Sequence, residues 1–378
     1  MTLDELRKEI DGIDTQMLTL FAKRMSSVEE MAALKKAEGL PVFHPEREKE
    51  ILGQVADKVP PHLHYYASSF CKYMMELSRT RQRELMAAAG SPNNEISLLL
   101  NNTHTELRNP RVTVQGISGA FSMSAALSMY PKGKMTYVAS WENVLYAVED
   151  GNCDYGVLPV ENSSAGSVNE VYDLLIKYKH YIVKALPLAV DQCLLGVRGA
   201  KLSDIRNVFS IPIAFAQCED FLRKHHKMQR FPNVNTAVAA EYIAREGKRE
   251  NAAIASKDCA HIYGLDILAN SIQQSNSNTT RFISVSKQSE IPDNANKISL
   301  VFTLPHVTGS LYRTLARFAL NGLNLTKIES RPNPQKNFEY YFYLDFTGSI
   351  RSKATLDLLT GLSEELPTFC FLGNYFEP

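Results

Sequence analysis

The feature that most constrains the fold is a hydrophobic pattern near the start of the chain with strict three- and four-residue spacing. This spacing is followed by Leu3, Leu6, Ile10, Ile13, Met17 and Leu20, and it resumes at Met31 and Leu34. It predicts a single amphipathic helix over residues 3–37, which at about 1.5 Å per residue would be ~50 Å long. A small domain is only ~30 Å wide, so this helix cannot bury its apolar face within its own segment. We therefore expect an intertwined dimer, with further helices over 45–58 and 62–88.

The composition is that of an ordinary folded protein with two to three domains. The chain has 378 residues, of which 44% are hydrophobic and 22% charged, and this content excludes wholesale disorder. The 41 Lys and Arg residues balance the 41 Asp and Glu residues, which argues against nucleic acid or an anionic membrane as the main partner. Small ligands are the better expectation.

Location and redox state also follow from the sequence. The chain contains no apolar run of ~18 residues and no signal-peptide pattern at its start, so we expect a cytoplasmic protein that does not enter a membrane. Its six cysteines are scattered without a CxxC pair. This arrangement is typical of reduced thiols and offers no framework for a metal.

Beyond the helical region, the pattern changes twice. Residues 87–110 are rich in Gly, Pro and Asn and are expected to form a linker. Strand, small polar turn and helix then recur near 112–128, 154–176, 205–224 and 252–263, which is typical of an open, mostly parallel sheet. Such sheets bind ligands at the carboxyl ends of their strands.

The last segment follows a polar stretch at 286–297 and has its own pattern. Strands and helices alternate as βαββαβ over 298–304, 311–322, 325–331, 338–347, 352–365 and 368–375. This order predicts a ferredoxin-like plait of about 80 residues. Its aromatic run FEYYFYLDF is expected to form core, because alternation on a strand buries every second side chain.

Two cations lie on the inward face of the long predicted helix. Arg24 occupies a position that the hydrophobic spacing would give to an apolar side chain, and Lys35 lies eleven residues on, about 20° around the helix. An unpaired buried charge is costly, so this face must meet an anion. From these residues alone, a protein carboxylate and a ligand are equally acceptable partners.

A set of polar residues spread over the three predicted helices resembles the site of the all-helical chorismate mutases, which are intertwined dimers. The set comprises Arg7, Arg24, Lys35, Arg47, Glu48, Ser78 and Gln82. The resemblance spans residues 1–88. It implies that Arg24 and the partner's Arg7 bind the carboxylates of chorismate.

The resemblance also implies roles for the remaining residues of this set. Lys35 and Gln82 would donate to the ether oxygen, Glu48 would accept the substrate hydroxyl, and Arg47 and Ser78 would complete the surroundings of the substrate. The rearrangement to prephenate is intramolecular, so the site must hold a reactive conformer and stabilise negative charge on the ether oxygen. Fixed cations meet both needs, and we expect neither metal nor cofactor.

One position departs from the mutase pattern. His44 stands before Pro45, where the family usually has Asp before the second helix. Histidine is a poorer cap than aspartate, by about 1 kcal/mol, although proline is well suited to the first helical turn. We expect weakened rather than abolished mutase activity.

The central segment contains four ordered motifs: GxxGxFS at 116–122, LPVENSSAGSVNEVYDLL at 158–175, FAQC at 215–218 and TTRF at 279–282. With these motifs, the segment closely resembles prephenate dehydratase. They imply two α/β lobes of the binding-protein type with a cleft between them, and Thr280 as the main catalytic candidate. Further residues implied to line the site are Asn162, Ser163, Ser210, Gln217 and Arg281.

The chemistry of prephenate suits this set of hydroxyl and amide groups. Prephenate loses carbon dioxide and hydroxide together, so the site must assist the leaving hydroxyl and exclude water. We expect Thr280 to act as a positioned hydrogen-bond donor, and Arg281 to hold a carboxylate unless it forms a salt bridge between the lobes. Met123 and Ile211 replace histidines that are common in the family, which predicts reduced activity.

The last segment contains two further motifs: GSLYRTL at 309–315 and IESRP at 328–332. By these motifs, it resembles the ACT domains that bind phenylalanine in prephenate dehydratases. They imply a phenylalanine site between paired domains formed by Gly309, Ser310, Leu311, Glu329, Ser330, Arg331 and Pro332. Phenylalanine would then act as a feedback inhibitor by favouring one arrangement of the lobes.

Taken together, the chain resembles the bifunctional chorismate mutase/prephenate dehydratases of bacterial phenylalanine synthesis. The implied fold is multidomain: an all-α mutase domain over 1–88, a bilobal α/β dehydratase domain over 111–286 and an α+β ferredoxin-like ACT domain over 297–378. The expected ligands are chorismate, prephenate and phenylalanine, in a homodimer or tetramer. Two alternatives stay open: an enzyme that retains one of the two activities, and a phenylalanine sensor without activity.

Overall fold

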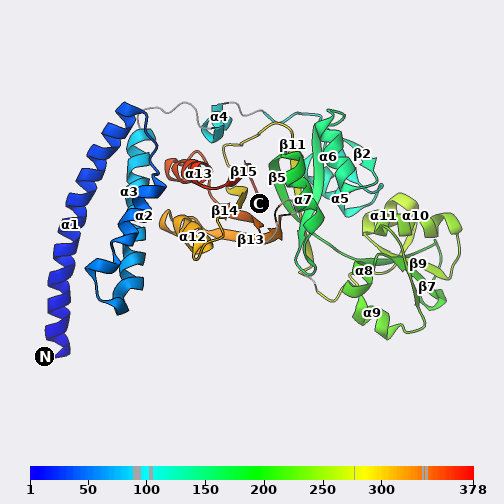
Figure 1. The fold of residues 1–378 in the computed structure, drawn as a ribbon. Helices are drawn as coiled ribbons and strands as arrows, with labels where there is room; N and C mark the ends of the chain where they lie inside the picture. The colour runs from blue at the N-terminus through cyan, green and yellow to red at the C-terminus, as the bar shows by residue number, and fades with distance from the viewer. Residues whose placement is uncertain (88–94, 102–104, 276, 334–335, 337–338) are drawn as a thin grey trace. The chain divides into compact units, whose positions relative to one another are not determined.

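A computed structural model describes residues 1–87, 95–101, 105–275, 277–333, 336 and 339–378. The chain forms two compact units (Figure 1). Unit 1 comprises Met1–Asn101, Thr303–Leu323 and Ile350–Phe369. Unit 2 comprises Asn102–Phe302, Asn324–Ser349 and Cys370–Pro378.

Unit 1 consists of helices. They are α1 (Leu3–Glu38), α2 (Pro45–Gly53), α3 (His64–Ala87), α4 (Glu95–Asn101), α12 (Ser310–Leu320) and α13 (Lys353–Glu365), with the short 3-10 turns η1 (Ala56–Lys58) and η2 (Pro61–Leu63). The prediction of one long first helix is confirmed. It begins with a reciprocal capping box between Thr2 and Glu5 and ends at Gly39, whose φ of 66° is left-handed.

Two other expectations in this region need correction. The second helix ends at Gly53 instead of residue 58, because the chain tightens into the 3-10 turn η1. The predicted linker over 87–110 contains α4, formed by the apolar run at its centre. Residues 88–94 and 102–104 of that stretch lie outside the described residues.

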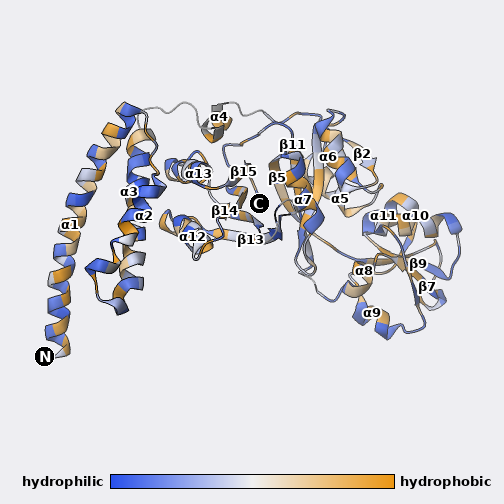
Figure 2. Ribbon diagram, in the orientation of Figure 1, coloured by the Kyte–Doolittle hydropathy of each residue, from blue (hydrophilic) through white to orange (hydrophobic). Residues whose placement is uncertain are grey.

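The apolar face of α1 is only partly covered within the chain. α1 packs against α3, and Val28 and Ala32 are the buried positions on it. Eight apolar residues of the hydrophobic pattern stay exposed along the helix: Leu3, Leu6, Ile10, Ile13, Met17, Leu20, Met31 and Leu34 (Figure 2). No helix among the described residues is long and apolar enough to cross a membrane.

The first lobe of unit 2 is built on a mixed sheet. Its strands are β2 (Lys134–Val138), β1 (Arg111–Gln115), β3 (Tyr155–Asn162), β11 (Thr279–Ser286) and β5 (Tyr181–Ala189) in spatial order, with β4 (Gly166–Ser167) paired to β3. The helices that join them are α5 (Phe121–Met129), α6 (Trp141–Glu149) and α7 (Asn169–Tyr178).

The second lobe has its own sheet. Its strands are β10 (Asp266–Ala269), β6 (Cys193–Gly196), β9 (Asn251–Ala255), β7 (Asn207–Ser210) and β8 (Gln229–Pro232) in spatial order. The intervening helices are η3 (Leu202–Asp204), α8 (Pro212–Gln217), α9 (Glu219–Lys224), α10 (Thr236–Glu246) and α11 (Lys257–Tyr263).

The two-lobed α/β arrangement is confirmed, but the sheets are mixed instead of mostly parallel. In each lobe, the β-α-β segments pair in parallel, as predicted. The strands next to the two crossings between the lobes, β5 and β6 on one and β10 and β11 on the other, pair antiparallel instead. The chain leaves the first lobe after β5 and returns to it at β11. Because it returns from the second lobe, β11 runs antiparallel to its neighbours β3 and β5.

The C-terminal segment has the predicted βαββαβ order. Its sheet runs β13 (Leu325–Pro332), β14 (Tyr340–Thr347), β12 (Lys297–Thr303) and β15 (Thr368–Tyr375), and β13 and β14 are antiparallel. The aromatic run on β14 is largely core, since Tyr343 and Phe346 are buried, whereas Tyr340 is exposed. Within unit 2, Tyr343 and Tyr375 share one core with Ile283 of β11.

Candidate functional site

Arg24 and Ser78 lie in contact between α1 and α3. The half-buried guanidinium of Arg24 donates to Ser78 Oγ at 2.5 Å and to the Met74 carbonyl oxygen at 3.5 Å. Ser78 is itself buried and donates to the same carbonyl at 2.6 Å. The structure therefore brings together two of the residues that the mutase resemblance selects.

Lys35 of α1 and Glu48 of α2 form a second group. The Lys35 ammonium donates to the Val42 carbonyl oxygen at 2.7 Å. Burial lowers the pKa of Lys35, and the nearby Glu48 carboxylate opposes this shift only in part. Glu48 is also ion-paired with Arg79, whose guanidinium lies 5.2 Å from the Phe43 ring centroid.

Arg79 was missed by the sequence reasoning. It directly follows Ser78, and its spacing of three from Glu76 predicts the ion pair that the two residues form. Burial by itself lowers the pKa of Arg79, but Glu76 and Glu48 outweigh burial and raise it. Arg79 thus holds the Glu48 carboxylate in place.

The remaining mutase residues differ in exposure. Gln82 is buried, and its Oε1 has no hydrogen-bond partner within the part of the chain that the structure describes. Arg7 and Arg47 are exposed and form local ion pairs with Asp4 and Glu50, at 3.3 and 2.6 Å. Their guanidinium groups therefore remain accessible from solvent.

His44 acts as the cap of α2 despite the departure from aspartate. Its Nδ1 accepts a hydrogen bond from the Arg47 backbone N–H at 3.4 Å. This distance is long for a cap, which agrees with the prediction that His44 caps less well than aspartate.

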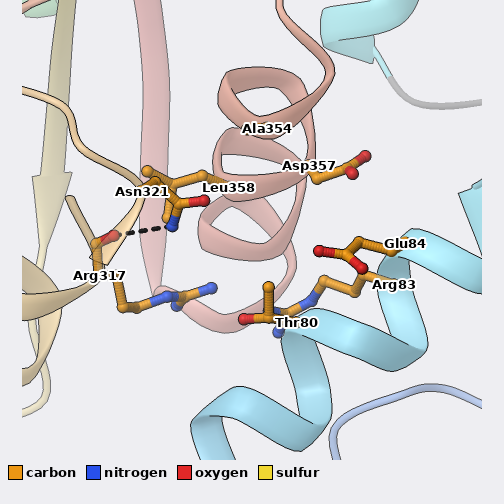
Figure 3. A pocket seen from close by; sticks show the side chains of 8 residues that line it. All are labelled: Thr80, Arg83, Glu84, Arg317, Asn321, Ala354, Asp357 and Leu358. Carbon is orange, nitrogen blue, oxygen red and sulfur yellow. Dashed lines mark hydrogen bonds between the residues drawn. The ribbon is translucent and has the colours of Figure 1, made fainter. Parts of the chain in front are cut away.

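A small pocket in unit 1 lies between α3 and the helices α12 and α13 (Figure 3). It is lined by Thr80, Arg83, Glu84, Arg317, Asn321, Ala354, Asp357 and Leu358. Glu365 forms ion pairs with Arg83 and Arg317, and Arg317 also pairs with Glu76 at 2.8 Å. Burial, with Arg317 nearby, lowers the pKa of Arg83 to about 10.

Asn162 and Thr280 stand opposite each other on β3 and β11 in the first lobe of unit 2. Asn162 Nδ2 donates to Thr280 Oγ1 at 2.9 Å and to Asn278 Oδ1 at 2.8 Å. Asn162 Oδ1 accepts from the backbone N–H groups of Ser164 and Ala165, at 2.9 and 3.0 Å. The Asn162 amide is thus fixed on both sides, with one N–H pointed at the Thr280 hydroxyl.

Two neighbours support this pair. Ser163 Oγ donates to the Ser277 carbonyl oxygen at 2.8 Å and accepts from the Thr279 N–H at 3.0 Å. Asn278 is buried, and the sequence reasoning missed it. Its signal was its position two residues before Thr280, which places both side chains on one face of an extended segment.

Ser210 and Gln217 belong to the second lobe. Ser210 is fully buried and donates to the Ile254 carbonyl oxygen at 2.7 Å. Gln217 Oε1 accepts from Gln192 Nε2 at 3.3 Å. Gln192, which the sequence reasoning also missed, lies on the first crossing between the lobes, and its buried Oε1 has no hydrogen-bond partner among the described residues.

The turn that contains GISGAFS joins the two lobes. Ser256 Oγ and Tyr263 Oη of the second lobe donate to the carbonyl oxygens of Gly119 and Ser118, at 2.9 and 2.7 Å. Gly119 requires a left-handed φ of 88°, and a Cβ there would lie 2.7 Å from Cys259 Sγ. Three of the four predicted turns, at 116, 209 and 254, are therefore linked by hydrogen bonds.

The two residues that replace family histidines lie close to these turns. Met123 is buried, and its sulfur accepts from the Tyr137 hydroxyl at 3.1 Å and from the Gly119 N–H at 3.4 Å. Ile211 packs on the apolar core of the second lobe. Neither position offers a proton donor.

Arg281, predicted to hold a carboxylate of the substrate, lies among carboxylates of the protein itself. The Arg281 guanidinium forms ion pairs with Asp345 and Glu377, and it donates to Tyr375 Oη at 2.8 Å. These partners come from the C-terminal segment and not from the second lobe. Strand alternation directs Arg281 away from the face that carries Thr280.

The residues predicted to bind phenylalanine lie in both units. Gly309 has a φ of 78° and precedes α12, while Ser310 Oγ donates to the Pro305 carbonyl oxygen at 2.8 Å. On β13, Glu329 accepts from Ser167 Oγ at 2.6 Å, and Arg331 pairs with Asp173 at 2.9 Å. Leu311 is half-buried, whereas Ser330 and Pro332 lie on the exposed face of β13.

Comparison with known proteins identifies two families along the chain. Residues 6–83 match the model of chorismate mutase type II, and residues 112–290 match that of prephenate dehydratase. A bifunctional chorismate mutase/prephenate dehydratase of Aquifex aeolicus is 31% identical over 99% of this chain and 97% of its own length.

Two further proteins are similar over the dehydratase and C-terminal segments. An arogenate dehydratase/prephenate dehydratase of Arabidopsis thaliana is 40% identical over 70% of this chain and 71% of its own length. The structure of a prephenate dehydratase from Arthrobacter aurescens in complex with L-Phe is 30% identical, with a TM-score of 0.65, over 70% of this chain and 89% of that one. The chain therefore belongs to the family of bifunctional chorismate mutases/prephenate dehydratases, enzymes of phenylalanine biosynthesis.

Proposed function

We propose that residues 1–88 rearrange chorismate to prephenate with fixed cations. Arg24 and the partner's Arg7 bind the substrate carboxylates, and Lys35 stabilises the negative charge that develops on the ether oxygen. The contact of Arg24 with Ser78 and the half-buried position of Lys35 support this proposal. The remaining roles are those of Gln82 as a second donor, Glu48 as acceptor for the substrate hydroxyl, and Arg47 and Ser78 as further contacts.

The exposed apolar residues of α1 support a dimer in which two chains cover each other's long helix. Arg7 lies near the start of α1, 17 positions before Arg24, which corresponds to roughly 25 Å along a helix. One chain therefore cannot bring both guanidinium groups to one small substrate. A paired chain that runs in the opposite direction supplies the missing cation.

We propose that residues 111–286 convert prephenate to phenylpyruvate between the two lobes. The observation that carries this proposal is the hydrogen bond from Asn162 Nδ2 to Thr280 Oγ1, because it leaves the hydroxyl hydrogen of Thr280 free to donate to the leaving hydroxyl of prephenate. Expulsion of that hydroxide and loss of carbon dioxide then form the aromatic ring. Ser163, Ser210 and Gln217 position the substrate or the turns that hold it.

Replacement of Thr280 tests the dehydratase assignment. Thr280→Val keeps the size of the side chain but removes the donor, so kcat for phenylpyruvate formation from prephenate should fall by about 10²-fold or more. Thr280→Ser should retain most of the activity, because it keeps the hydroxyl. Thr280→Ser is also the control for folding of unit 2, since chorismate consumption reports on unit 1 alone. Full dehydratase activity in Thr280→Val would exclude this role.

We further propose that residues 297–378 bind phenylalanine and inhibit the dehydratase. The Gly309 turn would offer backbone N–H groups to the carboxylate of the effector, and Glu329 and Arg331 would supply charge. Phenylalanine should lower phenylpyruvate output from the unaltered protein but not from Arg331→Ala or Gly309→Val. Equal inhibition of all three proteins would remove the assignment.

Prephenate is the proposed substrate of the dehydratase, and the Arabidopsis relative is named for both arogenate and prephenate. Parallel assays with the two compounds distinguish them.

A cytoplasmic location is also proposed, on the basis of the six free cysteines.

A further inference from the structure

The residue pair formed by Asn162 and Thr280 is followed, one position along the sheet, by a second pair, Glu161 and Arg281. In the ladder between β3 and β11, Thr280 is opposite Asn162 and Arg281 is opposite Glu161. Neighbouring residues on a strand direct their side chains to opposite faces of the sheet. The side chains of Glu161 and Arg281 therefore face away from the proposed reaction site. In the chain, however, Glu161 is the neighbour of Asn162 and Arg281 is the neighbour of Thr280.

Both residues of this second pair are held by the C-terminal sheet. Arg281 forms ion pairs with Asp345 of β14 and with Glu377. Glu161 forms an ion pair with Lys327 of β13 at 2.9 Å. All five residues belong to unit 2, so these contacts lie inside one compact body.

The Arg281 contacts are buried and further braced. The side chain of Arg281 is 15% exposed and that of Asp345 9%. Ser299 Oγ donates to the other oxygen of Asp345 at 2.6 Å and lies 2.7 Å from Tyr375 Oη, which accepts from Arg281. A planar guanidinium with three fixed acceptors has little freedom to move.

The Glu161 side is similarly braced. The Lys327 ammonium also donates to Ser167 Oγ at 2.9 Å, and Ser167 donates to Glu329 at 2.6 Å. Residues 161 and 167 are partners in the β3–β4 hairpin that encloses the ENSSAG turn. One lysine therefore holds both ends of the segment that carries Asn162 and Ser163.

We propose that Glu161 and Arg281 are positioning residues of the dehydratase, which lock the Asn162–Thr280 pair in register through ion pairs with the C-terminal sheet. This inference rests on the proposed roles of Asn162 and Thr280. It assigns to Arg281 an action through its neighbour and no contact with substrate. The ladder between β11 and β3 shifts register directly after Arg281, so an anchor at this point resists slippage of Thr280.

Steady-state kinetics with prephenate test this inference in the full-length protein. Arg281→Gln should lower kcat by about tenfold to a hundredfold with little change in KM, because the donor is misplaced while substrate binding is retained. Arg281→Lys should restore part of the loss. Glu377→Gln and Lys327→Gln remove partners that never approach the substrate, and each should lower kcat in the same way but less.

Arg230→Gln is the matched control, since it removes a two-bonded arginine–carboxylate pair, with Glu219, on the surface of the second lobe. It should leave kcat and KM unchanged. A circular dichroism melt compared with the unaltered protein reports on the folding of every variant, because mutase activity reports on unit 1 alone. Where Arg281→Gln does not fold, Glu377→Gln takes its place. If Arg281 binds a substrate carboxylate instead, Arg281→Gln raises KM and Glu377→Gln and Lys327→Gln have no effect, which overturns the inference. An unaltered protein without dehydratase activity would refute the proposed function itself, a result distinct from either.

Discussion

Lys35 carries its charge in a half-buried position, and this determines how the mutase should respond to pH. Burial lowers the pKa of Lys35 from its ordinary value of 10.5. The protonated form is needed to stabilise the ether oxygen, so kcat/KM for chorismate should fall as the pH rises through this lowered pKa. The sign is fixed, because an ammonium group is charged below its pKa and neutral above it.

Two variants make this pH prediction specific. Lys35→Arg should move the alkaline fall to higher pH, since a guanidinium stays protonated. Glu48→Gln should move it to lower pH, because the Glu48 carboxylate is the group that raises the Lys35 pKa. The pH profile of chorismate consumption measures both. An alkaline fall at the same pH in all three proteins would show that Lys35 is not the titrating group.

For single residues, strand and helix periodicity predicted which side chains share a face of an element. Periodicity did not predict which other groups each side chain contacts. Helix periodicity placed Arg24 on the inward face of α1, where it contacts Ser78 of α3. The selection of Thr280 and Asn162, by contrast, came from the resemblance to prephenate dehydratase.

Alternation along TTRF places Arg281 on the face opposite to Thr280, although the sequence analysis assigned both residues to one site. The partners of Arg281 are Asp345 and Glu377, which lie 64 and 96 positions further along the chain. A local sequence pattern cannot predict contacts at this separation.

Among the elements, α3 is tied to α12 and α13 by buried charges. Arg79, Arg83 and Arg317 lie close to Glu76 and Glu365, and Glu365 pairs with Arg83 and Arg317. Each of these side chains is at most 15% exposed. Removal of one carboxylate leaves buried guanidinium groups without full compensation.

Glu365→Gln should therefore destabilise unit 1 strongly. The loss of one partner from a buried ion pair costs about 3–5 kcal/mol, so the urea midpoint of helix unfolding should fall clearly. Glu364→Gln is the matched control. Its carboxylate also attracts Arg83 and Arg317, but the side chain is exposed and solvent screens this attraction, so the change should stay within about 0.5 kcal/mol. Equal midpoints for the two variants would mean that the cluster contributes little to stability.

The helices and strands themselves were mostly predictable from local signals. Thr2, Glu5 and Gly39 mark both ends of α1, and the βαββαβ order of the last segment was read from periodicity alone. The errors have physical causes. The mixed character of both sheets depends on where the chain crosses between lobes, and α4 is a short apolar run inside a stretch rich in asparagine.

At the scale of the whole molecule, the proposed dimer connects the long first helix with the mutase reaction. In that dimer, a second chain covers the exposed apolar residues of α1 and brings the cation that completes each mutase site. The central and C-terminal segments are linked in a different way, because β11 shares one core and a set of ion pairs with the C-terminal strands. Pairing of chains should therefore affect the mutase more directly than the dehydratase.

Subunit mixing tests this central claim most directly. Arg7→Ala and Arg24→Ala are prepared separately, and each should have mutase activity reduced by about 10²-fold, with dehydratase activity retained. After unfolding and refolding together, random pairing gives mixed dimers in which one of two sites has both arginines, so about a quarter of the unaltered mutase activity should return. The contrary result is a refolded mixture that forms dimers but has no more mutase activity than the two separate variants. Each site would then contain both arginines of one chain, and the account of the mutase would be wrong.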